Sequence, residues 1–457
     1  MYTPHTDKDI REMLDAVGVP SLEKLLEVPD AVKLQEGLDI VPALSESDIV
    51  RRFDHFAKKN TGASSVSFLG AGAYRHYTPP AIAALAMRGE FLTAYTPYQA
   101  EVSQGYLQAI YEWQTYICLL TGLDIANASV YDGATALAEA AIMALNANGR
   151  KKVLVSRAVH PNYRAVLKTY CDGLEVEIDE LPAGKDGTTD LSDVAQRVAS
   201  KEYACVAIQS PNFFGNVDTP DAAVQAAIQA SGTVLIGVVA EALALAALQT
   251  PASWGAEIVA GEAQSFGVAL AYGGPYVGFI ASNKDHMRRI PGRLVGKTLD
   301  VHGNEAFVLT LQAREQHIRR ERATSNICTN QAHCALIATM YLALMGKTGL
   351  RDVASANLKR SRQLATRVSS LPGRTLQFEA PFFNEVVVNV HQPAREVLAQ
   401  LKERGILGGV DLGRYYPEYS DCILMAATEL TSTADIEALC SALEEVANVP
   451  PFAEASR

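Results

Sequence analysis

The sequence has no excess of positive charge. Its 40 lysine and arginine residues are outnumbered by 51 aspartate and glutamate residues, which gives a formal net charge of −11 at pH 7. Non-specific binding to nucleic acid needs a basic surface, so this balance excludes that class of function. The basic cluster between Arg314 and Arg322 is local and favours an internal site or an ion-pair network. The content of 48% hydrophobic and 20% charged residues is typical of a globular protein.

Cysteine motifs are also absent. The seven cysteines are scattered along the chain, none is arranged as CxxC, and neither Cys328 nor Cys334 has a histidine at the spacing of a zinc site. We therefore expect neither a disulfide framework nor a bound metal. The odd number of cysteines fits a reducing compartment.

No stretch is apolar for long enough to cross a membrane. The most apolar run, residues 233–248, is interrupted by Glu241 and is shorter than the ~20 residues that a spanning helix needs. Residues 1–8 contain no apolar run and include an early acid, unlike a secretory signal or a mitochondrial presequence. We expect a soluble protein, located in the cytoplasm and without a membrane partner.

The chain divides into three parts by its sequence pattern. Residues 1–63 are charged and helical, with frequent glycine and proline, which predicts several short helices in an N-terminal arm. Such an arm either embraces a partner subunit or caps its own core. Residues 331–457 begin with a long helical stretch, to about residue 370, and continue as a small C-terminal α/β domain.

Residues 64–330 alternate helices with short apolar strands. The strands are β-branched and continuous enough to be buried on both faces. The clearest of them are residues 153–156, 204–210, 233–240 and 277–282. This alternation predicts a large α/β domain whose mainly parallel sheet is covered by helices on both sides.

Lysine is missing from residues 202–283 of this large domain, between Lys201 and Lys284. In pyridoxal-phosphate (PLP) enzymes built on such a frame, this segment carries the lysine that holds the cofactor as a Schiff base. Gln264 occupies that slot. The preceding strand should also deliver an acid to the pyridine nitrogen. It offers only Ala240 or Glu241, and Glu241 is more simply explained as a helix cap or a buried partner.

Two further features suit the edge of a sheet that binds a ligand. Gly133, Ala134 and Thr135 follow Asp132 at the start of an alanine-rich helix, where backbone N–H groups and the helix dipole favour an anion such as phosphate. An ordinary helix cap explains the same residues. His160 follows the next strand and stands either in a turn or against the ring of a cofactor.

Several stretches give the sequence a family resemblance. They are FLGAGAY (68–74), TAYTPYQAE (93–101) with SQG (103–105), FGV (266–268) with YGGP (272–275), PGRLVG (291–296), and REQHIRR (314–320) with ATSNICT (323–329). In this order the chain resembles the glycine decarboxylase family, the PLP protein of the glycine cleavage system. It is most similar to the amino-terminal (alpha) subunit of the form that is split into two chains. The resemblance implies an aspartate-aminotransferase-like fold (PLP fold type I), with a large domain and a small C-terminal domain.

The resemblance also implies how the work is shared between two chains. The cofactor lysine belongs to the related beta subunit, so this chain is expected to bind no cofactor covalently and to be inactive alone. Its own site is then vestigial and comprises Gly133, Ala134, Thr135, His160 and Gln264. Together, in an α2β2 heterotetramer, the chains decarboxylate glycine and transfer the aminomethyl group to the lipoyl arm of the H protein.

Two groups of residues are candidates for completing the partner's pocket. Tyr95, Tyr98, Gln99 and Glu101 lie on a loop stiffened by proline, which presents aromatic and polar ends together. Packing at a subunit interface explains the tyrosines equally well. The second group either attracts a carboxylate or forms a structural ion-pair network, and it consists of Arg314, His317, Arg319 and Arg320.

Three other hypotheses remain open. The chain could be an independent PLP enzyme that uses a lysine outside the gap, such as Lys284 or Lys297. It could be a purely structural subunit that contributes no group to the active site. Finally, it could be a regulatory module that retains a ligand in the vestigial cleft.

Overall fold

The computed structural model describes residues 4–447, except 27, 30, 35–37 and 329. The expectations for residues 1–3 and 448–457, and for Thr329 of the last family stretch, fall outside the described residues. Contacts divide the chain into two compact units, Met1–Ala63 and Ser64–Arg457.

The first unit contains short helices, as its frequent glycine and proline predict. They are α1 (Asp7–Val17), η1 (Leu22–Leu25) and α2 (Glu46–Lys58). Thr6 and Asp9 form a capping box at the start of α1, and Gly18 ends this helix with a φ of 80°. On α2, Ile49, Phe53 and Phe56 recur at helical spacing, and the three side chains are 43–65% exposed.

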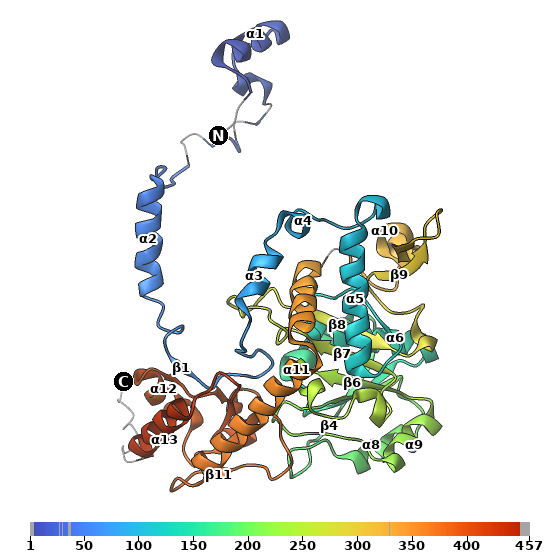
Figure 1. The fold of residues 1–457 in the computed structure, drawn as a ribbon, viewed down its shortest axis with the longest axis vertical. Coiled ribbons are helices and arrows are strands. Elements are labelled where there is room, and N and C mark those ends of the chain that lie inside the picture. The colour runs from blue at the N-terminus through green and yellow to red at the C-terminus, as the bar shows by residue number, and fades with distance from the viewer. Residues whose placement is uncertain (1–3, 27, 30, 35–37, 329, 448–457) are drawn as a thin grey trace. The chain divides into compact units, whose positions relative to one another are not determined.

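The second unit is built on a seven-stranded sheet (Figure 1). In spatial order its strands are β2 (Ile125–Ala126), β8 (Gly278–Ser282), β7 (Ile258–Glu262), β6 (Val234–Val239), β5 (Cys205–Gln209), β3 (Lys152–Ser156) and β4 (Glu177–Leu181). Neighbouring strands from β7 to β4 are parallel, which confirms the mainly parallel sheet. The pairs β7–β8 and β8–β2 are antiparallel, a direction that the sequence pattern did not reveal. Every residue of β5, β6, β7 and β8 is buried.

Helices cover both faces of this sheet, as expected. One face packs against α5 (Gln104–Thr121), α8 (Leu191–Val198), α9 (Ala222–Ser231) and the first part of α11 (Ala332–Ser369). The other face packs against α6 (Gly133–Asn148) and α7 (Pro161–Gly173). Alternate residues of β5 serve the two sides: Val206 and Ile208 enter one core, and Cys205 and Ala207 enter the other.

A second, smaller sheet follows α11. It is antiparallel, with the order β11 (Thr375–Leu376), β12 (Glu385–Asn389), β15 (Cys422–Ala426) and β14 (Val410–Asp411), and it packs against α12 (Ala394–Glu403) and α13 (Thr433–Ala447). Strand β11 is shorter than residues 374–379, for which the sequence pattern predicts a strand. The expected long helix is interrupted, because Gly346 has φ 57° and ψ −172° inside α11.

Shorter elements connect these parts. They include α3 (Pro80–Ala86), α4 (Gly89–Leu92), η2 (Ala100–Val102), the antiparallel pair β9 (Leu294–Leu299) and β10 (Glu305–Thr310), and β1 (Val66–Ser67), which pairs with β13 (Ile406–Leu407). Across the described part of the chain, no helix combines the length and the apolar character needed to cross a membrane.

Candidate functional site

The N-terminus of α6 lies where the sequence suggests a cradle for phosphate. The carboxylate of Asp132 accepts a hydrogen bond from the backbone N–H of Thr135 at 2.7 Å. The N–H of Gly133 donates to Oε2 of Glu262 at 3.0 Å. The other oxygen of Glu262 accepts from the N–H groups of Gln264 and Val277, each at 3.0 Å. The chain's own carboxylates therefore occupy two of the three backbone donors, those of Gly133 and Thr135, that would hold an anion.

The space beside this helix start is filled as well. A Cβ atom added to Gly133 would lie 2.2 Å from the hydroxyl oxygen of Tyr163. Glu262 is 3% exposed, and its burial raises the pKa of this carboxyl to about 7. A phosphate would have to displace Glu262 and Tyr163 together. The residues present do not fit the phosphate of a PLP cofactor.

Gln264, at the expected lysine position, is bonded through its side-chain amide. Its Oε1 accepts from the N–H of Tyr74 at 2.9 Å, and its Nε2 donates to the carbonyl oxygens of Tyr74 at 3.1 Å and Val268 at 2.8 Å. The amide thus serves one donor and two acceptors in a buried place. A lysine has no acceptor atom and would leave the N–H of Tyr74 without its partner.

Tyr74 belongs to residues 70–77, which we call the strap. Its Ala71 N–H and Tyr74 hydroxyl donate to the two carboxylate oxygens of Glu385, at 2.6 and 2.7 Å. Burial raises the pKa of Glu385 to about 7. Gly72 has a φ of 91°, and a Cβ there would lie 2.8 Å from Nε2 of His160. Glycine is therefore required where the strap passes this histidine.

His160 supports the strap instead of presenting a free ring. Its Nδ1 accepts from the N–H of Asn162 at 3.1 Å, so the neutral ring carries its proton on Nε2, which donates to the carbonyl of Ala71 at 2.8 Å. Burial lowers the pKa of His160 to about 4. The ring stacks on Tyr163, with centroids 4.9 Å apart. The sequence left open whether His160 stands in a turn or against the ring of a cofactor. In the structure the residue caps α7, and the face of its ring contacts Tyr163.

Glu241 is a cap and a buried partner, as its position after β6 suggests. It accepts from the N–H of Leu243 at 2.9 Å and from the side-chain amide of Asn384 at 3.1 Å. It also lies 3.1 Å from Nε2 of His76, whose Nδ1 is 2.9 Å from Glu429. Burial opposes a charge on His76, but the two carboxylates outweigh it and raise the pKa of His76 to about 9. This buried trio joins the strap to both sheets.

The remaining candidates lie on the surface or near it. Tyr95, Gln99 and Glu101 are exposed on the loop between α4 and α5. Tyr98, on the same loop, is 49% exposed and meets His317 edge to face, with ring centroids 5.7 Å apart. The structure therefore brings Tyr98 of the first candidate group into direct contact with His317 of the second.

Arg314 orders the main chain. Its guanidinium donates to the carbonyl oxygens of Ile290 and Gly292, and burial lowers its pKa. Two residues that we did not select join Tyr98 and His317 instead, namely Arg293 and Glu315. Arg293 lies within the family stretch 291–296, and this position was the feature of the sequence that could have identified it as a candidate.

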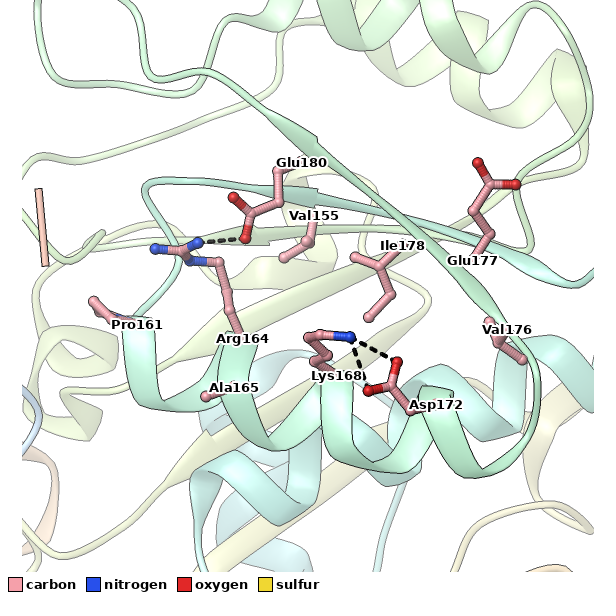
Figure 2. A pocket seen from close by; sticks show the side chains of 10 residues that line it. All are labelled: Val155, Pro161, Arg164, Ala165, Lys168, Asp172, Val176, Glu177, Ile178 and Glu180. Atoms are coloured by element: carbon pink, nitrogen blue, oxygen red, sulfur yellow. Dashed lines mark hydrogen bonds and ion pairs between the residues drawn. The ribbon is translucent and has the colours of Figure 1, made fainter.

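A groove lies elsewhere, between α7 and the edge strand β4 (Figure 2). Its volume is about 510 Å³. Lys168 pairs with Asp172 at 2.8 Å, and Arg164 pairs with Glu180. Because each cationic side chain of the lining is paired, the groove offers no free charge to an anion.

Lys284 and Lys297, the two lysines named as alternatives outside the gap, are exposed. Lys284 begins a single turn after β8, and Lys297 pairs with Glu305 across the β9–β10 hairpin. Neither lies in a buried site of the kind that lowers the pKa of a Schiff-base lysine.

Comparisons with known proteins agree on one family. The model of the "Glycine cleavage system P-protein" family matches residues 1–443. The probable glycine dehydrogenase (decarboxylating) subunit 1 of Brevibacillus brevis is 47% identical over 447 residues, which are 97% of this chain and 98% of that protein. A crystal structure of glycine decarboxylase (P-protein) of the glycine cleavage system, in inhibitor-bound form, is 43% identical. It matches with a TM-score of 0.89 over 98% of this chain and 100% of the other.

A more distant structure shares the fold alone. The sphingosine-1-phosphate lyase of Burkholderia pseudomallei is 12% identical and matches with a TM-score of 0.66 over 91% of this chain and 93% of its own. These structures confirm the expected PLP type I fold, and the family match confirms the family resemblance of the sequence. The chain belongs to the glycine cleavage system P-protein family.

Proposed function

We propose that this chain is the subunit of glycine dehydrogenase (decarboxylating) that carries no cofactor, and that a second, related subunit carries PLP. The observation that carries the proposal is the hydrogen bonding at the start of α6, where a phosphate would sit: Glu262 accepts from the N–H of Gly133, and Asp132 accepts from the N–H of Thr135. Gln264 adds to it, because this amide is bonded in the place of the lysine. The site of this chain is accordingly vestigial.

The role of the chain is then to complete the active site of its partner. Tyr98 and His317 contact each other at the surface and are our candidates for reaching across. The reaction is the decarboxylation of glycine, with transfer of the aminomethyl group to the lipoyl arm of the H protein. We infer an α2β2 assembly in the cytoplasm, in line with the subunit naming of the relatives.

Exposed apolar side chains support the existence of a partner. In the second unit they recur over residues 77–102, on the strap, α3, α4 and the loop before α5. Those exposed by at least 49% are Tyr77, Met87, Leu92, Tyr95, Tyr98 and Val102. A cluster of this kind in one stretch marks a protein interface better than single scattered residues do.

The test is reconstitution with the second subunit and the H protein. Glycine-dependent release of carbon dioxide should require both chains, and neither alone should support it. The proposal would be overturned if the second subunit and the H protein released carbon dioxide equally well with and without this chain. Activity of this chain alone would instead favour an independent PLP enzyme, for which Lys284 and Lys297 are poorly placed.

A purely structural role is distinguished by a substitution at the surface candidate. Tyr98→Phe should lower turnover of the mixed enzyme while the two subunits stay associated, as sedimentation would show. An unchanged rate would assign the chain a structural role only.

A further inference from the structure

Tyr98 rests on a buried arginine. Arg293 precedes β9, and it is 7% exposed, whereas Tyr98 is 49% exposed. Nη2 of Arg293 lies 3.1 Å from the hydroxyl oxygen of Tyr98, and the guanidinium carbon lies 5.5 Å from the centre of its ring. A buried cation thus supports a phenol that reaches the surface.

The direction of this hydrogen bond follows from the chemistry of the two groups. A guanidinium has only donors, so the phenol oxygen must be the acceptor. The proton of the phenol is then not used in this contact. Within the described residues, the hydroxyl of Tyr98 makes no other hydrogen bond. The proton of this hydroxyl therefore has no acceptor among the described residues.

Arg293 is itself fixed from two further sides. Its Nη1 donates to the carbonyl of Cys328 at 2.9 Å. Its Nε lies 3.9 Å from Oε2 of Glu315, a residue that is also 7% exposed. The opposite charge of Glu315 keeps the buried guanidinium from being an uncompensated charge. Arg293 thereby couples the loop of Tyr98 to the segments that hold Glu315 and Cys328.

His317 completes the arrangement on the exposed side. Its Nδ1 lies 3.5 Å from Oε2 of Glu315, and its ring meets that of Tyr98 at an interplanar angle of 61°. The same carboxylate therefore lies close to both groups that touch Tyr98. The phenol ring therefore contacts both a guanidinium and an imidazole.

We propose that Arg293 is a positioning residue that turns Tyr98 into a directed hydrogen-bond donor for an anionic oxygen, such as a carboxylate, in the shared active site. The proposal rests on the proposed function, since the acceptor belongs to the substrate or to the partner's site. Two observations carry it: the direction of the hydrogen bond, in which the phenol oxygen accepts, and the burial of Arg293 against a tyrosine that is 49% exposed. The positive charge below the phenol also favours an anionic acceptor over a cationic one.

The experiment is a double-substitution cycle in the two-subunit enzyme. Arg293→Lys keeps the positive charge but loses the two-pronged guanidinium. It should lower kcat between about 10- and 100-fold, as expected when a catalytic contact is misplaced by about 1 Å. In the Tyr98→Phe background, the same change should alter kcat less than about twofold, because Arg293 acts through the hydroxyl. Arg289→Lys is the matched control, since Arg289 donates only to backbone carbonyls and should leave kcat unchanged.

A second variant guards against loss of folding. Arg293→Gly removes the side chain, and added guanidinium ion should restore activity in the chain that keeps Tyr98 but not in the Tyr98→Phe chain. Equal loss of kcat from Arg293→Lys in both backgrounds, or rescue in both, would overturn the positioning role. A wild-type mixture without glycine-dependent activity would instead overturn the proposed function, so the two failures are distinct.

Discussion

At the scale of single residues, the chain's own groups fill the positions that we propose for a vestigial cofactor site. Glu262 takes the place of an anion at the start of α6, and Gln264 bonds the strap where a lysine is expected. Tyr163 covers the face of His160. Each replacement satisfies groups that would otherwise be buried without partners, so none can be reversed alone without a cost in stability.

The first prediction concerns the lysine position. Gln264→Lys should lower the free energy of unfolding by about 1–3 kcal/mol, because the N–H of Tyr74 loses its acceptor in a buried place. Urea unfolding measures the change. Gln229→Lys, on the exposed side of α9, is the control and should change it by less than about 0.5 kcal/mol. Borohydride treatment with PLP should give no label at position 264, and a stoichiometric label there would show that Glu262 does not block the site.

The second prediction concerns the charge on His76. Its folded pKa of about 9 exceeds the ordinary value of 6.5, so the stabilisation by Glu241 and Glu429 is complete below about pH 6.5 and is lost as the pH rises through about 9. The difference corresponds to about 3 kcal/mol. His76→Gln should therefore destabilise the protein at pH 6 and much less above pH 9.5.

Urea unfolding of both proteins across this range isolates the effect of His76 from other groups. His302→Gln, at the exposed tip of the β9–β10 hairpin, should show no such dependence on pH. A constant difference between the wild type and His76→Gln would show that the histidine is not charged in the folded state.

At the scale of elements, the apolar pattern of the sequence predicted where strands and helices lie. It did not predict the direction of the strands or the interruption of a helix. The runs that became β3, β5, β6 and β8 were found because unbroken β-branched stretches are buried on both faces. The same pattern says nothing about strand direction, so antiparallel β8 was not anticipated. The break at Gly346 lies within an otherwise helical sequence, where a single glycine is a weak signal.

The third prediction belongs to helix α2. Ile49, Phe53 and Phe56 form an apolar face that the described residues of the first unit leave 43–65% exposed. If the second subunit covers this face, Phe53→Asp should weaken the association of the two chains at least tenfold, as expected for a buried aromatic anchor at an interface. His55→Asp is the control, because it introduces aspartate on the polar side of α2. It should have little effect on the affinity of the two chains. Equal affinities by titration calorimetry would show that this face is not part of the interface.

At the scale of the whole molecule, the family and fold could be predicted, but the filled site could not. The family stretches were recognisable in the sequence, and the missing lysine marked the site as unusual. The contacts that fill it join residues far apart, such as Ala71 with Glu385 and Gly133 with Glu262. No local sequence pattern predicts either contact, because the partners are 314 and 129 residues apart in the chain. Arg293 was overlooked for the same reason, since its contact with Tyr98 exists only in the folded chain.

The most direct test of the central claim is a cofactor test on the purified chain alone. PLP is added, the excess is removed, the protein is treated with borohydride, and the labelled peptides are mapped by mass spectrometry. The account predicts no stoichiometric label at any single lysine, because Glu262 and Gln264 occupy the places of the phosphate and the lysine. A stoichiometric label at one lysine would contradict it and would make this chain a PLP enzyme in its own right.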